Sequence, residues 1–153
     1  PSLRERGWII ESADFPLLRV TFLALPIRVP IAPLTVDLDY TNYNLIPPSV
    51  RFLHPMTFKP VTIPAWYKAD GQILNAMVQA HPQTGEPFFC HSGIREYHSH
   101  PQHSGDSWDL YRYAEEANTY GILDRIWRYC IKTIKGAMFT MVVSNDVRVY
   151  QEL

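Results

Sequence analysis

The sequence predicts an α+β fold in a single domain spanning residues 1–153: an antiparallel strand meander, a long active-site loop and a C-terminal helix. Ten of the 13 prolines lie at or before Pro64, and none follows Pro101. Because proline disrupts helix interiors, long helices are expected only in the last part of the chain. The proline-rich part instead contains short apolar runs separated by turn residues, and the last part contains an apolar stripe at helical spacing.

Strands are expected in the first part at residues 17–25, 34–40 and 49–53. Residues 34–40 alternate apolar and polar side chains, which is the period of a strand with one solvated face. The short linkers, rich in Pro, Asn and Thr, favour an antiparallel meander. Residues 67–79 fit a turn followed by either a strand or a short helix, and residues 86–109 fit a structured loop.

A helix is expected over residues 118–135, with Asn118 as its N-cap. Apolar residues recur there every four positions, at Ile122, Ile126, Cys130 and Ile134. Residues 107–112 are compatible with the start of a shorter helix. Residues 137–143 and 147–150 are expected to form terminal strands joined by a Ser-Asn-Asp turn.

The composition excludes several classes of protein. Hydrophobic residues make up 46% of the chain and charged residues 19%, which excludes a disordered protein. The net charge of −1 lacks the basic excess of most nucleic-acid binders, and no apolar run is long enough to span a bilayer. We therefore expect neither nucleic acid nor a membrane as a partner. Two cysteines cannot build a disulfide framework, which favours a cytoplasmic protein.

Five of the six histidines lie between His81 and His103, in a segment that also contains Cys90 and Glu96. Two kinds of chemistry fit this cluster. Thiolate, imidazole and carboxylate are the ligands that zinc prefers, and a zinc site would use Cys90, Glu96, His100 and His103. Alternatively, Cys90 is a nucleophile that neighbouring imidazoles activate. A polar loop that is merely rich in histidine is the third interpretation.

Several residues resemble the ubiquitin-conjugating enzymes. His81-Pro82-Gln83 before Cys90 resembles the His-Pro-Asn element that precedes the active-site cysteine of that family, with Gln83 in place of the asparagine. Trp108 falls where the family has a tryptophan before its next helix. The segment of residues 34–55 resembles the strand, proline-rich turn and strand of the family, with matching residues Tyr43, Pro47, Pro48, Val50 and Phe52.

The histidine-rich loop after Cys90 resembles a bacterial group of this fold that is named for a Cys-Glu-His-His pattern. Cys90, Glu96, Trp108 and two of the three histidines His98, His100 and His103 match it. The resemblance implies a ubiquitin-conjugating-enzyme-like fold and a carrier in a bacterial ubiquitin-like modification pathway. Its partners would be an activating enzyme, a ubiquitin-like protein and a protein substrate.

The resemblance also implies roles for individual residues. Cys90 would accept the ubiquitin-like protein as a thioester and pass it to an amine. Gln83 would donate a hydrogen bond to the oxyanion. One of His98, His100 or His103 would deprotonate the amine, and Glu96 would orient that imidazole. No cofactor is required for this chemistry, and zinc is the cofactor of the alternative site.

A second family resemblance competes with the first. His98-Ser-His100-Pro101 resembles the His-x-His-Pro zinc motif of JAB/MPN deubiquitinating metalloproteases. That motif also needs a downstream Ser-x-x-Asp, and the nearest pattern, Ser104-Gly-Asp106, is one residue too short. Hydrolytic zinc chemistry is therefore the less favoured expectation.

Overall fold

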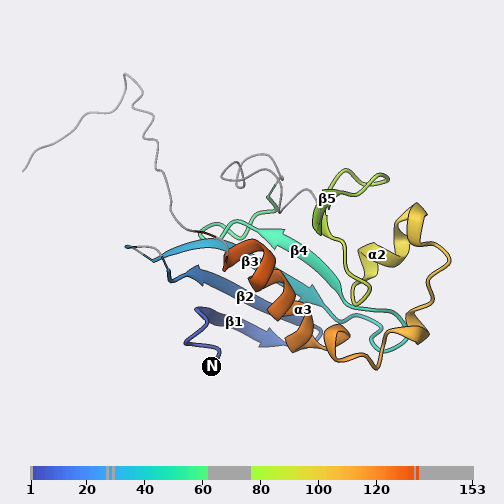
Figure 1. Cartoon of the computed structure of the whole chain (residues 1–153), viewed down its shortest axis with the longest axis horizontal. Coiled ribbons are helices and arrows are strands. Elements are labelled where there is room, and N and C mark those ends of the chain that lie inside the picture. Colours follow the sequence, from blue (N-terminus) through green and yellow to red (C-terminus); the bar gives the residue numbers. More distant parts are fainter. Residues whose placement is uncertain (1, 27, 29, 62–76, 133, 135–153) are drawn as a thin grey trace, which may run out of the picture.

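A meander of antiparallel strands forms the main sheet of the computed structural model (Figure 1), which describes residues 2–26, 28, 30–61, 77–132 and 134. The strand order is β1-β2-β3-β4, so each strand pairs with its neighbour in sequence. The strands are β1 (Trp8–Asp14), β2 (Leu17–Ala24), β3 (Ile31–Asp39) and β4 (Ser49–Leu53). The α+β class and the meander are therefore confirmed.

The alternation in the sequence decides which side chains face the core. Val20 of β2 pairs with Val36 of β3, which pairs in turn with Phe52 of β4. These three side chains are at most 4% exposed and lie on one face of the sheet. On the opposite face, Thr21 and Thr35 share a buried hydrogen bond of 2.7 Å between their hydroxyls.

A helix packs against the apolar face of the sheet, as Figure 1 shows. The α-helix α3 (Thr119–Ile126) continues into a π-helical turn, η5 (Trp127–Ile131). Asn118 is its N-cap as predicted, because its side chain accepts a 2.8 Å hydrogen bond from the Gly121 N–H. Cys130 is 2% exposed and belongs to the core.

In the sequence between β4 and α3, the chain forms the part of the structure that contains the histidine-rich segment. A hairpin of β5 (Val78–Ala80) and β6 (Pro87–Phe89) packs beside β4 and is followed by the short helix α2 (Arg95–Ser99). Single 3-10 turns come next: η2 (Pro101–His103), η3 (Trp108–Leu110) and η4 (Glu115–Ala117).

Two expectations need correction. The sequence analysis did not predict β1, and residues 107–112 contain a single 3-10 turn around Trp108 rather than the start of a helix. The strands expected at residues 137–143 and 147–150 lie outside the described residues. No helix within the described part of the chain is long and apolar enough to cross a membrane.

Candidate active site

Cys90 lies directly after strand β6, where the chain leaves the small sheet. Its backbone N–H donates a 2.6 Å hydrogen bond to the Met77 carbonyl, which extends the β5–β6 pairing by one residue. The chain then turns, and the fully buried Ile94 anchors it in the core before α2 begins. The thiol is thus held on rigid backbone, although its side chain is only partly buried.

Helix α2 is clamped to the start of β4. The Arg95 side chain donates hydrogen bonds to the carbonyls of Thr41 and Pro47, at 2.9 and 3.3 Å. The Glu96 carboxylate accepts hydrogen bonds from the Ser49 hydroxyl and from the Val50 N–H. Glu96 therefore fastens α2 to the main sheet and does not orient a histidine at Cys90.

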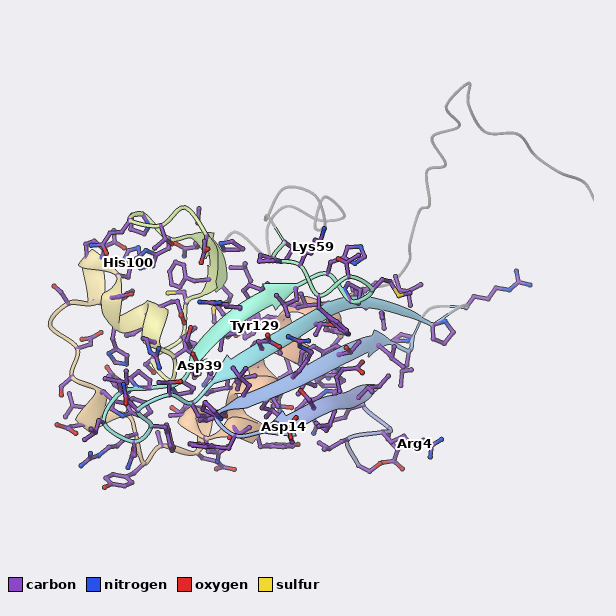
Figure 2. All side chains as sticks on the ribbon, turned by 180° about the vertical axis from the view of Figure 1, so that it is seen from behind. Arg4, Asp14, Asp39, Lys59, His100 and Tyr129 are labelled. Carbon is purple, nitrogen blue, oxygen red and sulfur yellow. The ribbon has the colours of Figure 1, made fainter. Side chains whose placement is uncertain are left out.

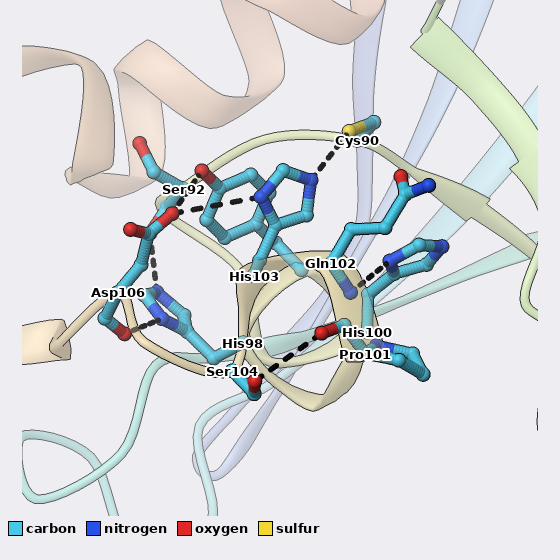
Figure 3. Close-up of polar contacts among 10 residues, drawn as sticks. Cys90, Ser92, His98, His100, Pro101, Gln102, His103, Ser104 and Asp106 are labelled. Carbon is cyan, nitrogen blue, oxygen red and sulfur yellow. Dashed lines mark hydrogen bonds and ion pairs between the residues drawn. The ribbon is translucent and has the colours of Figure 1, made fainter.

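The next turn brings His103 to Cys90, as Figure 3 shows. The His103 Nε2 atom lies 3.8 Å from the Cys90 Sγ atom. On the other side of the ring, His103 Nδ1 lies 3.5 Å from the Asp106 Oδ2 atom. A thiol, an imidazole and a carboxylate in this order are the arrangement of a nucleophile, a base and the group that orients the base. We call Cys90, His103 and Asp106 the triad.

Burial affects the thiol of the triad. Partial burial raises the pKa of Cys90 above its ordinary value, so at neutral pH the side chain is a thiol rather than a thiolate. A buried thiol becomes a nucleophile only when a base takes its proton. His103 Nε2 is the base within reach, since the described contacts place it beside Sγ.

His98 and His100, two of the predicted bases, have other partners. The two ring nitrogens of His98 face backbone carbonyls, with Nδ1 2.9 Å from Asp106 O and Nε2 2.7 Å from Ser92 O. His98 thus ties the cysteine loop to the Asp106 loop, and neither nitrogen is positioned to accept a proton from Cys90. His100 is buried, and its Nδ1 accepts a hydrogen bond from the Gln102 N–H at 3.2 Å. Burial and the nearby histidines lower the pKa of His100, which keeps it neutral in this capping role.

The structure separates Gln83 from Cys90. Gln83 lies in the turn beyond the Ala80–Pro87 pair, which is the last pair of the hairpin. Cys90 lies three residues beyond Pro87 at the opposite end, about 10 Å along the strand. The amide side chain that Figure 3 labels among the residues around Cys90 and His103 is that of Gln102, which is adjacent to His103 in η2.

The predicted zinc ligands do not converge. Cys90 and His103 lie together, but Glu96 is bonded to β4, and the Nδ1 atom of His100 caps a turn. Among the described residues, no group of three or more His, Cys, Asp or Glu side chains is arranged to hold a metal ion. The residues present therefore do not fit the zinc site of the alternative expectation.

The sequence analysis missed one member of the triad. Asp106 was considered only in the Ser104-Gly-Asp106 pattern and received no role. Its signal was the spacing of His103 and Asp106, since residues three apart in a turn can contact each other, as these two do. His100, the N-cap of the turn η2 that contains His103, lies at the end of the molecule opposite Arg4, as Figure 2 shows.

Comparisons with known proteins agree over almost all of the described chain. The model of the Y4jH-like family matches residues 2–66 and 60–134, which include the main sheet, the triad and helix α3. The protein y4jH of Sinorhizobium fredii (strain NBRC 101917 / NGR234) is 29% identical over 147 residues, covering 82% of this chain and 72% of that protein. On the strength of the family match, this chain belongs to the Y4jH-like family.

Proposed function

We propose that this protein transfers an acyl group through a thioester on Cys90. The observation that carries the proposal is the triad itself, in which His103 lies 3.8 Å from the thiol and 3.5 Å from the Asp106 carboxylate. The acyl donor we propose is the C-terminus of a ubiquitin-like protein held as a thioester on an activating enzyme. The acceptor is an amine of a protein substrate.

The reaction has two steps. His103 Nε2 takes the proton of the Cys90 thiol, and the thiolate attacks the carbonyl carbon of the donor thioester. The tetrahedral intermediate then expels the thiolate of the activating enzyme, which receives a proton. In the second step the amine attacks the new thioester, Cys90 leaves as a thiolate, and the amine loses a proton. The Asp106 carboxylate stabilises the imidazolium that forms when His103 holds the proton.

The oxyanion of each tetrahedral intermediate needs a hydrogen-bond donor. Gln102 is the candidate, because it directly precedes His103 in η2 and has an exposed side-chain amide. That carboxamide forms no hydrogen bond with any residue that the structure describes, so its N–H groups are available to a substrate. Gln102 thus takes the role that the sequence analysis assigned to Gln83.

Two further features support a ubiquitin-like donor over a small acyl group. A four-stranded meander, a cysteine loop and a helix packed on the sheet follow one another in the order that the resemblance to ubiquitin-conjugating enzymes implies. Trp108 is buried beside the site, and its indole N–H donates a 3.1 Å hydrogen bond to the Asn44 carbonyl. This contact connects the loop after Cys90 to the β3–β4 turn, where the matching proline-rich segment lies.

A peptide thioester tests the proposed chemistry without a partner protein. A peptide that ends in Gly-Gly, prepared as its mercaptoethanesulfonate thioester, is incubated with the protein, and the intact mass is followed. We expect a single peptide adduct that dithiothreitol removes, and we expect added lysine to discharge it faster than water does. Cys90→Ala should abolish the adduct, and His103→Ala should slow its formation about 100-fold or more, since a general base typically contributes about 10² to 10⁴-fold.

Cys130→Ala is the matched control. Cys130 is buried in the core, and burial raises its pKa to about 12, so it should contribute nothing to the adduct. Adduct formation at the same rate in Cys90→Ala or in His103→Ala would contradict the proposal. Discharge by water that lysine does not accelerate would indicate a thioesterase instead of a transferase.

A further inference from the structure

Tyr97 contacts two members of the triad with two different parts of its side chain. Its ring stacks on the His103 imidazole, with a centroid distance of 3.9 Å and an interplanar angle of 17°. Its hydroxyl donates a 2.6 Å hydrogen bond to Asp106 Oδ2. This is the same oxygen that lies 3.5 Å from His103 Nδ1.

The neighbours of Tyr97 fix its position. Glu96 on one side is bonded to Ser49 and Val50 of β4, and His98 on the other side bridges the carbonyls of Ser92 and Asp106. Tyr97 itself packs against the edge of the main core. Burial, followed by the hydrogen bond to Asp106, raises the pKa of Tyr97, so at neutral pH the phenol is protonated and donates.

Among the described contacts, few others hold the side chains of His103 and Asp106. Their side chains are 26% and 38% exposed, so both could turn toward solvent. The stacked ring limits the rotation of the imidazole, which keeps Nε2 directed at Cys90. The hydroxyl fixes the carboxylate, which keeps Oδ2 directed at His103 Nδ1. Each contact therefore orients one member of the triad, the imidazole of His103 or the carboxylate of Asp106.

We infer that Tyr97 is a positioning residue that sets the orientation of His103 toward the Cys90 thiol. The inference rests on the proposed role of the triad and deepens it. Tyr97 does not touch the reacting atoms, so it acts through His103 and Asp106. Its loss should change the reactivity of Cys90 only when His103 is present, whereas a purely structural role would act with or without the histidine.

The test uses iodoacetamide, which alkylates Cys90 without any partner protein. Alkylation rates are measured against pH for the wild type, Tyr97→Phe, Tyr97→Leu, His103→Ala and the double variant Tyr97→Phe/His103→Ala. In His103→Ala we expect the rate to be low near neutral pH and to rise steadily toward alkaline pH without a shoulder, because burial raises the pKa of the Cys90 thiol. The wild type should show additional reactivity near neutral pH.

Tyr97→Phe keeps the stacked ring but loses the hydroxyl. It should lower the neutral-pH rate about threefold to tenfold, the factor that one hydrogen bond typically carries. Tyr97→Leu loses both contacts and should approach His103→Ala. When His103 is already replaced by alanine, adding Tyr97→Phe should change the alkylation rate by less than about twofold. Such non-additive effects are expected of residues that act as a unit. Tyr113→Phe is the control, since Tyr113 is 79% exposed.

Three outcomes separate the inference from the proposal on which it rests. If Tyr97→Phe slows alkylation of Cys90 equally with and without His103, the inference alone is overturned. The inference alone is also overturned if Tyr97→Phe leaves the alkylation rate unchanged while His103→Ala lowers it. A wild-type profile identical to that of His103→Ala overturns the base role of His103 and the inference with it. Urea unfolding of each variant confirms folding, and Tyr97→Phe carries the test if Tyr97→Leu does not fold.

Discussion

His91, the residue after Cys90, provides a quantitative test of how the cysteine loop is built. Its side chain is 5% exposed, and its Nδ1 atom accepts a 2.9 Å hydrogen bond from the Gly93 N–H. The ring therefore has to be neutral, because a protonated Nδ1 cannot accept a hydrogen bond. The pKa of His91 is lowered from 6.5 to about 4, chiefly by burial and to a smaller extent by Arg125, while Glu116 opposes the shift.

The sign of the effect follows from the two states of the protein. Below pH 6.5 the unfolded chain takes up a proton at His91, whereas the folded chain does so only near pH 4. Protonation therefore favours the unfolded state, and stability is lost as the pH falls through this interval. A tenfold difference in proton affinity is worth about 1.4 kcal/mol, so the full effect is about 3 kcal/mol. That is a large part of the 5–15 kcal/mol by which domains are typically stable.

The matched variant is His91→Asn. An asparagine Oδ1 accepts the same hydrogen bond from the N–H two residues later and does not titrate. Urea unfolding of both proteins between pH 7 and pH 4 should show the wild type losing about 3 kcal/mol relative to the variant. Both proteins contain every other titrating group, so the contributions of those groups cancel when the free energies of unfolding of the two proteins are subtracted at each pH. Parallel pH profiles for the two proteins would refute the neutral, buried assignment of His91.

Three further predictions concern the loop, the core and the oxyanion. Gly93→Ala should destabilise the fold by about 1–3 kcal/mol in urea unfolding, since its Cβ would lie 2.9 Å from both Ala117 Cα and His91 Nδ1. The raised pKa of Cys130, about 12 against 9.0, should cost stability as the pH rises above 9, and Cys130→Ala should lack that slope of up to about 1.4 kcal/mol per pH unit. Gln102→Ala should slow acylation by the peptide thioester about 100-fold while leaving iodoacetamide alkylation unchanged, because only acylation forms an oxyanion. Equal effects on both reactions would remove Gln102 from the oxyanion role.

Among the strands that the sequence predicted, the one at residues 34–40 rests on a period of two, whereas residues 17–25 were predicted from an apolar run. Residues 34–40 alternate regularly, and β3 was found within a few residues of its actual ends. Strand β1 was missed because its register shifts between Ile10 and Ser12. An irregularity of this kind adds a residue and reverses the alternation, so the pattern of a half-buried strand is lost. Ile9 and Ile10, both more than 40% exposed, further hide the signal.

The C-terminal helix was predicted in type but not in form. A side chain every four residues advances by about 40° around an α-helix with each step, because the α-helix has 3.6 residues per turn. After two such steps Cys130 lies about 80° from Ile122, still within the apolar stripe of an ordinary α-helix, which is about 100° wide. The structure instead has a π-helical turn at Trp127–Ile131, with Cys130 buried in the core. The spacing therefore predicted the buried face but not the π turn.

The sequence located the candidate site and named Cys90 and His103 within it, but it did not separate His103 from the other histidines and gave Asp106 no role. The density of histidine around Cys90 indicated the right segment, and Cys90 and His103 do lie together. Glu96 and Gln83 were assigned from a resemblance. The position of Glu96 relative to Cys90 depends on how α2 docks on β4, and that of Gln83 depends on the direction of the β5–β6 hairpin. Both depend on contacts between residues far apart in sequence, which a local pattern does not contain.

The histidine density also has a structural origin that a search for metal ligands overlooks. Four of the six histidines accept a hydrogen bond at Nδ1 from the backbone N–H two residues later: His54, His81, His91 and His100. In these turns histidine does what asparagine does in an Asx turn. We therefore expect His100→Asn to preserve both the fold and the alkylation rate of Cys90. His103→Asn should also fold, because no such backbone bond involves the His103 ring among the described contacts, but it should lose the neutral-pH reactivity that depends on a base. Equal losses of reactivity in the two variants would contradict this division of roles between turn formation and catalysis.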